Sequence, residues 1–474
     1  MAHQDHGRQG AQRTCADDLF QALRWILTGV HWRSVRFRED CTWTPWQLAV
    51  AALLWAWSDE KTLGDRFAAA RKITHRSMVE QDEPAKSYQA FIKLLSKWTT
   101  PLLAALSEAF RTRMRQTLAS VWTVADWVVL AADGSRLDVP RTRGNEMRYA
   151  PKSKLARAAQ KRRRARRTIK SRTKEQLRER KANIPSIWLT MLWHVGSGLP
   201  WDWRTGPSDS SERKHLTEML GTLPAGALVT ADAGFVGYPL WQAAFDAGVQ
   251  LLVRVGGNVR LLRKLGYAQE RAGTVYLWPN QAAKRNSPPL VLRLIVIDNG
   301  RHPVYLVTSL LQRNQLSDAD AAHIYRRRWD IELFYRHCKQ TFERRKLRSR
   351  NPDNAMLELH WSLMGMWALG LHSHHHLLQR GVLPERISFA GVLRAYRRAM
   401  REYKSPPDPG EQLSAMLTRS VLDDYVRKNK HSRDYPRKKH EQSAGRPKLL
   451  NATQSQIQQA KHLTPAKSDK RLTA

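Results

Sequence analysis

Apolar side chains in the first 120 residues recur every three or four positions, which is the spacing of helices that bury one face. Pro45 opens the second of these segments, where a proline suits the first turn of a helix. The predicted helices span residues 16–29, 45–57, 61–73, 86–98 and 101–122. Together they indicate a helical N-terminal domain over residues 1–122.

From residue 126 the pattern changes to short apolar runs separated by turn residues, which is typical of strands. Strands are predicted at residues 126–133, 186–194, 199–204, 226–232 and 250–255, with helices at 211–220 and from residue 239. This order predicts an α/β fold with a mixed five-stranded sheet, whose first three strands are antiparallel. A β-rich insertion, residues 256–315, follows, with strands at 274–278, 290–298 and 303–310 and a hairpin turn at Asn299-Gly300.

The segment from Ser317 to Lys339 is predicted to form one helix, because Ser317 is a suitable N-cap and Asp320 follows three residues later. At about 100° per residue, four polar side chains of this helix fall within an arc of about 60°. They are Tyr325, Arg328, Glu332 and Lys339. The apolar residues Ile331, Phe334 and Cys338 point away from that arc and predict a face that docks on the sheet.

The remaining chain returns to a helical pattern, with helices predicted at 354–378 and 387–403 inside a C-terminal region over residues 351–426. His372 and His376 have a spacing that zinc would accept, but no nearby acid or thiol completes such a site, and a polar helix end is the preferred interpretation. Residues 427–474 are basic and poor in large apolar side chains, so a disordered tail is expected.

The composition adds a strong charge signal. The 474 residues contain 80 Lys and Arg against 42 Asp and Glu, for a formal net charge of +38. Such an excess indicates a polyanionic partner, and double-stranded DNA is the first candidate. Residues 58–72 could then form a helix-turn-helix that binds DNA ends, or could simply pack.

A basic run over residues 141–181 is the densest concentration of this charge. The alternative of a localisation tag is disfavoured, because the run interrupts a predicted core between two strands. We expect its centre to contact phosphates, through Lys161, Arg162, Arg163, Arg164, Arg166 and Arg167.

The sequence also argues against other classes of protein. The longest apolar stretch, residues 355–371, is broken by Glu358 and His360, so no membrane span and no membrane partner are expected. The three cysteines lack a C-x-x-C spacing, which argues against a disulfide framework. The first residues lack the apolar core of a signal peptide, and a cytoplasmic, nucleoid-associated location is expected.

Two aspartates occupy similar local contexts. Asp133 and Asp232 are each predicted at the end of an apolar strand, a position from which a carboxylate can hold a metal ion over the sheet edge. Taken alone, Asp133-Gly134 is better explained as a turn. Asp138 is a competing acid, expected to lie beyond the strand.

The spacing Y-x2-R-x3-E-x6-K of Tyr325, Arg328, Glu332 and Lys339 resembles the signature of the insertion sequence family 4 transposases. This resemblance implies a cut-and-paste DNA transposase with an RNase H-like core and a DDE triad of Asp133, Asp232 and Glu332. It implies two Mg²⁺ ions, with Mn²⁺ as a substitute, Asp133 bridging them, and Asp232 and Glu332 each holding one. Tyr325, Arg328 and Lys339 would then grip phosphates near the cut.

The resemblance implies further properties of the complex with DNA. Element ends and target DNA would be bound by a homodimer, and some members of the family free their ends through a DNA hairpin. Trp278, in the β-rich insertion, is the candidate to stack on a base that leaves the duplex, and packing under the insertion is its alternative. Two other functions stay open: an RNase H-like nuclease without strand transfer, and a non-catalytic DNA-binding protein.

Overall fold

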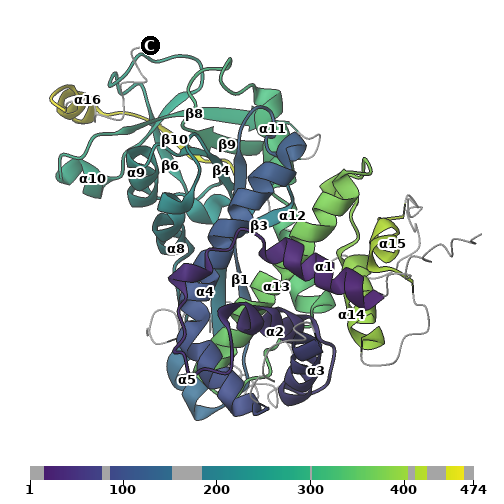
Figure 1. Ribbon diagram of the computed structural model, residues 1–474. Coiled ribbons are helices and arrows are strands. Elements are labelled where there is room, and N and C mark those ends of the chain that lie inside the picture. Colours follow the sequence, from purple (N-terminus) through teal and green to yellow (C-terminus); the bar gives the residue numbers. More distant parts are fainter. Residues whose placement is uncertain are drawn as a thin grey trace, which may run out of the picture. The chain divides into compact units, whose positions relative to one another are not determined.

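The computed structural model describes residues 15–76, 86–151, 184–298, 302–403, 411–423 and 445–463 (Figure 1). The chain forms two compact units. A helical unit contains residues 1–119 and 337–423, and a sheet unit contains residues 120–336 and 424–474. The N-terminal and C-terminal helices therefore share one unit, rather than forming the two separate domains that the sequence predicts.

The helical unit is built around α2 (Pro45–Trp57), in which every residue from Gln47 to Trp57 is buried. Thr44 begins this helix with a reciprocal capping box with Gln47. Trp57 donates its indole N–H to the carbonyl of Gly365, 2.9 Å away in α13. The other described helices of the unit are α1 (Cys15–Leu27), η1 (Trp32–Ser34), α3 (Leu63–Arg76), α4 (Tyr88–Thr117), η5 (His337–Thr341), α13 (Pro352–Leu378), η6 (Pro384–Arg386), α14 (Phe389–Glu402) and α15 (Leu413–Thr418). Within the described ranges, none of the helices is both long and apolar enough to cross a membrane.

The prediction of two helices at 86–98 and 101–122 is wrong, because α4 continues through Pro101 as a single helix of 30 residues. A proline inside a helix costs about 3 kcal/mol when nothing compensates. Here the flanking side chains are buried, and Trp361 of α13 donates to the hydroxyl of Thr99 at 2.9 Å. Tertiary packing therefore overrides the tendency of Pro101 to end the helix.

The histidines near the end of α13 take part in packing within this helical unit. His372 shares a hydrogen bond of 2.7 Å with the hydroxyl of Tyr396, and the ring of His375 stacks on Trp25 at 4.8 Å between centroids. Across the described ranges, no three His, Cys, Asp or Glu side chains are grouped closely enough to hold a metal ion. The zinc alternative for His372 and His376 gains no support.

The sheet unit contains one ten-stranded sheet in the order β10-β6-β7-β8-β9-β5-β4-β1-β2-β3. Strand β1 pairs antiparallel with β2 and parallel with β4, β2 pairs antiparallel with β3, and β4 pairs parallel with β5. The strands are β1 (Val129–Asp138), β2 (Ser186–His194), β3 (Leu199–Gly206), β4 (Leu228–Ala231), β5 (Gln250–Val255), β6 (Arg260–Arg263), β7 (Thr274–Leu277), β8 (Leu290–Ile297), β9 (Val304–Thr308) and β10 (Lys448–Asn451).

The β-rich insertion extends this sheet, because β9 pairs antiparallel with β5. The predicted five strands are thus one end of a larger sheet. The predicted turn at Asn299-Gly300 lies outside the described residues.

The described helices and helical turns of the sheet unit are α5 (Arg143–Tyr149), α8 (Glu212–Met219), η3 (Leu220–Thr222), η4 (Ala233–Phe235), α9 (Tyr238–Asp246), α10 (Asn280–Lys284), α11 (Asp318–Arg327), α12 (Asp330–Arg336) and α16 (Gln454–Lys461). The turn η2 (Ala119–Val121) spans the boundary at which this unit begins.

The prediction of a disordered tail is wrong for residues 445–463. Strand β10 pairs parallel with β6 from Lys448 to Asn451, and α16 lies beside the insertion (Figure 1). Ala460 of α16 is buried in one apolar cluster with Leu262, Tyr276 and Trp278. A few well-placed apolar residues are therefore enough to hold this segment in a tail that is otherwise polar and basic.

Candidate active site

Asp133 and Asp232 lie side by side in the sheet unit. The parallel register of β1 and β4 pairs Ala132 with Ala231, so the next position on each chain is an aspartate. Asp232 follows the end of β4, as predicted, and its side chain accepts the N–H of Gly234 at 2.8 Å. This register supports the interpretation, made from the sequence, that both strands lead to one site.

Strand β1 does not end at Asp133, and this part of the prediction is wrong. The strand continues to Asp138, and Asp133 pairs with Met191 of β2 in its middle. Asp138 closes the strand instead of lying beyond it. Because Asp133 and Asp138 are an odd number of residues apart, their side chains point to opposite faces of the sheet, and Asp138 is exposed.

Glu332 reaches the same site through α12, but the single helix predicted from Ser317 to Lys339 is broken. Helix α11 ends at Arg327, a two-residue turn follows, and α12 starts at Asp330. The hydroxyl of Tyr335 donates to the main-chain carbonyl of Asp133 at 2.8 Å. Phe334 packs on Trp193 of β2 with 4.9 Å between ring centroids. These two contacts fix α12 on the sheet beside Asp133. Phe334 belongs to the apolar face that the sequence predicts, and Tyr335 was not predicted to take part.

Arg328 lies at the break between the two helices and pairs with Glu332 at 3.1 Å. Its guanidinium also lies 5.5 Å from the ring centre of Tyr325, so these three residues of the motif are together. Burial would lower the pKa of Arg328, but Tyr325, Glu332 and Asp133 outweigh that effect and the net shift is upward. Lys339 lies in η5 (His337–Thr341), which belongs to the helical unit.

A further acid, Glu212, lies near Asp232, on the face of β1 opposite to the side chain of Asp133, and was not predicted. An ideal Cβ placed on Gly134 would lie only 2.2 Å from Oε1 of Glu212, so the glutamate lies directly over the residue that follows Asp133. Glu212 is the first residue of α8, where an acid is ordinarily explained by the helix dipole. The glycine after Asp133 is the signal that could have found it, since a missing side chain leaves room for another group.

Burial and neighbouring acids raise the pKa values of two of these carboxyl groups, those of Asp133 and Glu212. Burial raises the pKa of Asp133 to about 6, with further contributions from the charges of Asp232 and Glu332. Burial likewise raises the pKa of Glu212 to about 7, with contributions from Asp232 and Asp133. Arg328 acts in the opposite direction on Asp133. The site is thus a concentration of partly desolvated carboxylates that a positive charge would stabilise.

The donor set fits a hard divalent cation, because all of the side chains offer carboxylate oxygens. In the described residues no three of them yet converge closely enough to bind one. The reason is local: Asp232 is turned toward the N–H of Gly234, and Glu332 toward Arg328.

The raised pKa of Glu212 predicts a pH-dependent stability difference. In EDTA, the folded chain keeps a proton on Glu212 that the unfolded chain has released, so stability from this group is present at low pH and is lost as pH rises from about 4.5 to about 7. Glu212→Gln should therefore be no more stable than the parent at pH 5 but more stable at pH 8, by on the order of 1–3 kcal/mol.

Urea denaturation of both proteins at several pH values measures this difference, and comparison with the parent removes the effect of all other titrating groups. Glu218→Gln is the matched control, since Glu218 is exposed on the same helix and its substitution should give a constant difference. If the difference in unfolding free energy between Glu212→Gln and the parent also stayed constant with pH, the prediction would be contradicted.

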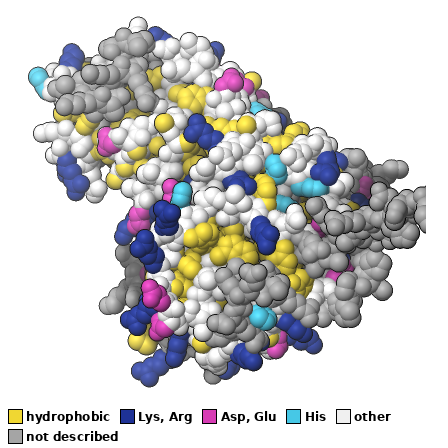
Figure 2. Space-filling view, in the orientation of Figure 1, with side chains coloured by type: hydrophobic (Ala, Val, Ile, Leu, Met, Phe, Trp, Pro, Cys, Tyr) yellow, Lys and Arg dark blue, Asp and Glu magenta, His cyan; other side chains and the backbone are white. Residues whose placement is uncertain are grey.

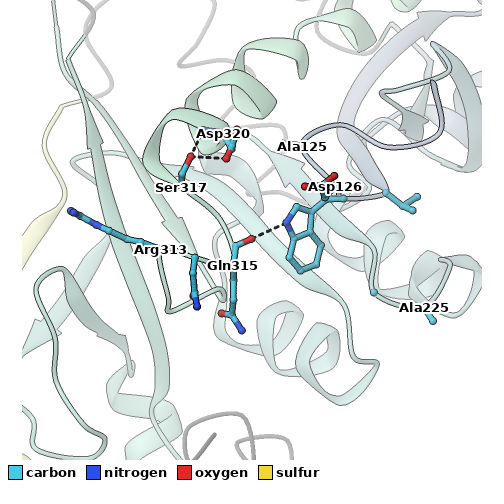
Figure 3. Close-up of a pocket in the computed structure, with 11 residues that line it drawn as sticks. Ala125, Asp126, Ala225, Arg313, Gln315, Ser317 and Asp320 are labelled. Carbon is cyan, nitrogen blue, oxygen red and sulfur yellow. Dashed lines mark hydrogen bonds between the residues drawn. The ribbon is translucent and has the colours of Figure 1, made fainter. Parts of the chain in front are cut away.

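A pocket of about 440 Å³ lies elsewhere in the sheet unit (Figure 3). It is lined by residues 125–128 and 225–226, which precede β1 and β4, whereas Asp133 and Asp232 lie toward the other ends of these parallel strands. The indole N–H of Trp127 donates to the carbonyl of Gln315 at 3.1 Å, and Figure 3 labels Gln315 among the lining residues. The pocket and the acids are therefore separate features of the sheet unit.

The predicted DNA-binding residues have three different outcomes. Lys161, Arg162, Arg163, Arg164, Arg166 and Arg167 lie outside the described residues. Tyr325 and Arg328 are at the acidic site. Trp278 is only 4% exposed and donates its N–H to the carbonyl of Ser287 at 2.8 Å, so its prediction as a partner for an unstacked base is wrong. Figure 2 shows Lys and Arg side chains spread over the visible face, in keeping with the net charge.

The chain is similar to the following known proteins. A family model described as "Transposase DDE domain" matches residues 128–367, which include all three predicted triad acids. "Transposase InsG for insertion sequence element IS4" of Escherichia coli (strain K12) is 25% identical over 197 residues, which cover 39% of this chain and 44% of that protein, less than half of its length. A cryo-EM structure of a piggyBac transposase synaptic complex with hairpin DNA gives a TM-score of 0.39 at 12% identity, covering 88% of each chain.

Proposed function

We propose that this chain, which belongs to the transposase DDE domain family and to its insertion sequence IS4 group, is a cut-and-paste DNA transposase. The observations that support the proposal are the register of β1 with β4, which puts Asp133 beside the strand that leads to Asp232, and the effect of the charges of Asp232 and Glu332 on Asp133. The expected element ends and target are double-stranded DNA, bound by a homodimer. The net charge of +38 supports a nucleic-acid partner.

An RNase H-like core is the fold that we assign to β1–β5 within the larger sheet. Their order, β3-β2-β1-β4-β5, combines three antiparallel strands with two strands parallel to β1, and places the two aspartates on neighbouring central strands. Glu332 then approaches from α12, which packs on β1 and β2 through Tyr335 and Phe334.

The chemistry proposed for this site is cleavage of a phosphodiester bond followed by attack of the freed 3′-hydroxyl on target DNA. Two divalent cations, Mg²⁺ or Mn²⁺, would supply activation of the attacking oxygen and stabilisation of the leaving oxygen when bound. Asp232 and Glu332 would each hold one cation, and Asp133, on which the charges of both act, would help to hold both.

Arg328 is proposed to exchange its partner when DNA binds. It is buried against Glu332 and Tyr325, and its charge also acts on Asp133. When DNA enters, a phosphate can take over as the partner of this guanidinium, which frees Glu332 to bind a cation. Tyr325 and Lys339, together with the basic run, are proposed to contact other phosphates.

The direct test uses a DNA fragment that carries the coding sequence with its natural flanking DNA, incubated with the purified chain, a target plasmid and Mg²⁺. A transposase should nick at the element ends and join the 3′-ends to the plasmid, and EDTA should stop both steps. Nicking without joining would instead show a nuclease without strand transfer. Binding without either step would show a non-catalytic DNA-binding protein.

Tyr335→Phe tests whether α12 positions Glu332. Loss of the bond to the carbonyl of Asp133 should cost about 0.5–1.5 kcal/mol of stability, and should reduce the cleavage rate because Glu332 is held less firmly. Tyr276→Phe is the control, since Tyr276 donates a hydrogen bond to the carboxylate of Glu270 in the β-rich insertion. It should lose at least as much stability, because a bond to a charged acceptor contributes more, and it should keep its cleavage rate. Equal cleavage by the two variants would contradict the positioning role.

A further inference from the structure

We infer that the helical unit encloses a small inorganic anion, chloride or phosphate, against the guanidinium group of Arg66. The inference does not depend on the function proposed above. It is carried by a cluster of arginine side chains at the end of α2, in which the most deeply buried guanidinium group lacks acceptors among the described residues.

Four arginine side chains each donate a hydrogen bond to a main-chain carbonyl between residues 56 and 61, at the end of α2 and in the loop after it. They are Arg66, Arg344, Arg348 and Arg397, and their acceptors are in turn Glu60 (2.8 Å), Ala56 (3.0 Å), Lys61 and Trp57 (2.9 Å). Because one short segment accepts from all four groups, their positive charges are concentrated in a small volume.

The end of α2 explains only part of this concentration. The last carbonyls of a helix lack partners within the helix and attract cations, which accounts for the bonds of Arg344 and Arg397 to the last two residues of α2. A helix end is equivalent to only about half a negative charge, however. It cannot balance four guanidinium groups.

The carboxylate that acts on both of the inner arginines, Arg66 and Arg344, is that of Glu358. Glu358 is itself buried, and its two oxygens accept the N–H groups of Arg348 and Ser349 and the hydroxyl of Ser349, at 2.9–3.1 Å. Its hydrogen-bonding capacity is therefore largely used by other donors. One carboxylate thus serves two buried cations.

Arg66 is the member of the cluster with unused donors. It is 0% exposed, and its Nε donates to the carbonyl of Glu60. Its Nη1 and Nη2 are buried and have no acceptor in the part of the chain that the structure describes, and the same holds for Nη2 of Arg397. Arg344, by contrast, donates through all three of its nitrogens.

The missing partner of Arg66 has to be negatively charged. Burial lowers the pKa of Arg66 to about 9, with further contributions from the charges of Arg344 and Arg348, so the side chain is still charged at pH 7. A buried charge without a partner is strongly unfavourable. The parallel N–H groups of a guanidinium fork suit an anion, and they leave no acceptor with which to bind a cation.

The burial of Arg66 also decides which kind of anion fits. A phosphate of duplex DNA is part of a continuous backbone and cannot reach a side chain that has no exposed surface. A free ion can be enclosed when the helical unit folds around it. Chloride and inorganic phosphate both accept hydrogen bonds from a guanidinium group, and the experiment below separates them.

Hydrogen exchange of the purified full chain tests the inference in sodium gluconate that is replaced stepwise by chloride or phosphate at constant ionic strength. Gluconate is too large to be enclosed in the same way. Amides of α3 (Leu63–Arg76), which carries Arg66, should gain protection, by about tenfold for each tenfold rise of the anion above its dissociation constant. The anion that acts at the lower concentration is the ligand.

Arg66→Met should remove this dependence on the anion. In gluconate alone it should protect α3 at least as well as the parent does, because an apolar side chain replaces a buried charge. Lys72→Met is the matched control, since Lys72 is exposed on the same helix and its substitution removes the same charge. It should keep the dependence of the parent. An equal dependence in the two variants would overturn the inference.

Arg66→Lys keeps the test decisive if Arg66→Met does not fold, because it retains the charge and loses only the planar fork. It should raise the anion concentration needed for half of the effect by about tenfold or more. Parent protection that is equal in gluconate, chloride and phosphate would show that water occupies the site, and would overturn the inference. Protection that rises with a DNA duplex but with neither free anion would overturn it in favour of a DNA phosphate.

Discussion

Asp133→Asn, Asp232→Asn and Glu332→Gln should each reduce cleavage of element ends by at least about a thousandfold, while DNA binding changes little. A carboxylate that holds a catalytic cation contributes several kcal/mol to transition-state stabilisation, and about 4 kcal/mol corresponds to a thousandfold in rate. The substitutions keep the size of each side chain. They also remove negative charge from a partly buried site, where burial disfavours the charged form of Asp133 and raises its pKa. Folding should therefore survive.

Asp138→Asn is the matched control for this series, because Asp138 lies on the same strand but is exposed on the opposite face. It should cut at close to the parent rate. Cleavage is measured on end-labelled DNA with Mg²⁺, and binding by gel shift with EDTA. If one triad variant retained more than a few per cent of the parent rate, that residue would have to be removed from the triad.

Trp278→Ala should destabilise the β-rich insertion by about 3–5 kcal/mol, which is the usual cost of truncating a buried tryptophan. The indole is 4% exposed, packs with Leu262, Leu265 and Ala460, and loses a hydrogen bond to Ser287 when removed. Hydrogen exchange of amides in β6, β7 and α16 measures the effect on this cluster directly. Protection there should fall by more than a hundredfold, since each 1.36 kcal/mol is a factor of about ten.

Trp329→Ala is the control for Trp278→Ala, because Trp329 is 56% exposed in the same unit. It should leave the protection of β6, β7 and α16 unchanged. A folded Trp278→Ala protein with full protection would show that this residue does not hold the insertion together, and would reopen the base-stacking interpretation that its burial now contradicts.

The regular elements of the sheet could be predicted from the sequence because their apolar runs are long and bounded by turn residues. The structure places β2 at Ser186–His194 and β5 at Gln250–Val255, which are the predicted bounds. Strand β1 was cut short at Asp133 because Asp-Gly is a strong turn signal. Its glycine serves the approach of Glu212 instead, and only tertiary structure shows that.

The elements that were predicted wrongly all depend on distant contacts. The break at Arg328 and Trp329 interrupts a segment whose helical pattern is continuous, and the buried pair of Arg328 with Glu332 forms across it. Strand β10 was missed because four residues in a polar tail acquire their structure only by pairing with β6. Glu212 was missed because a first-turn acid has an ordinary explanation in the helix dipole.

The pairing of β10 with β6 has a consequence for the newly synthesised chain. Arg260 and Lys448 are register partners, yet a ribosome adding 5–20 residues per second needs on the order of 10–40 s to travel from one to the other. During that interval β6 is an open sheet edge, which is a template for pairing with another chain. Arg260 and Arg263, the exposed residues at the two ends of β6, put charge on that edge. They would discourage aggregation of nascent chains until β10 has emerged to cover the strand.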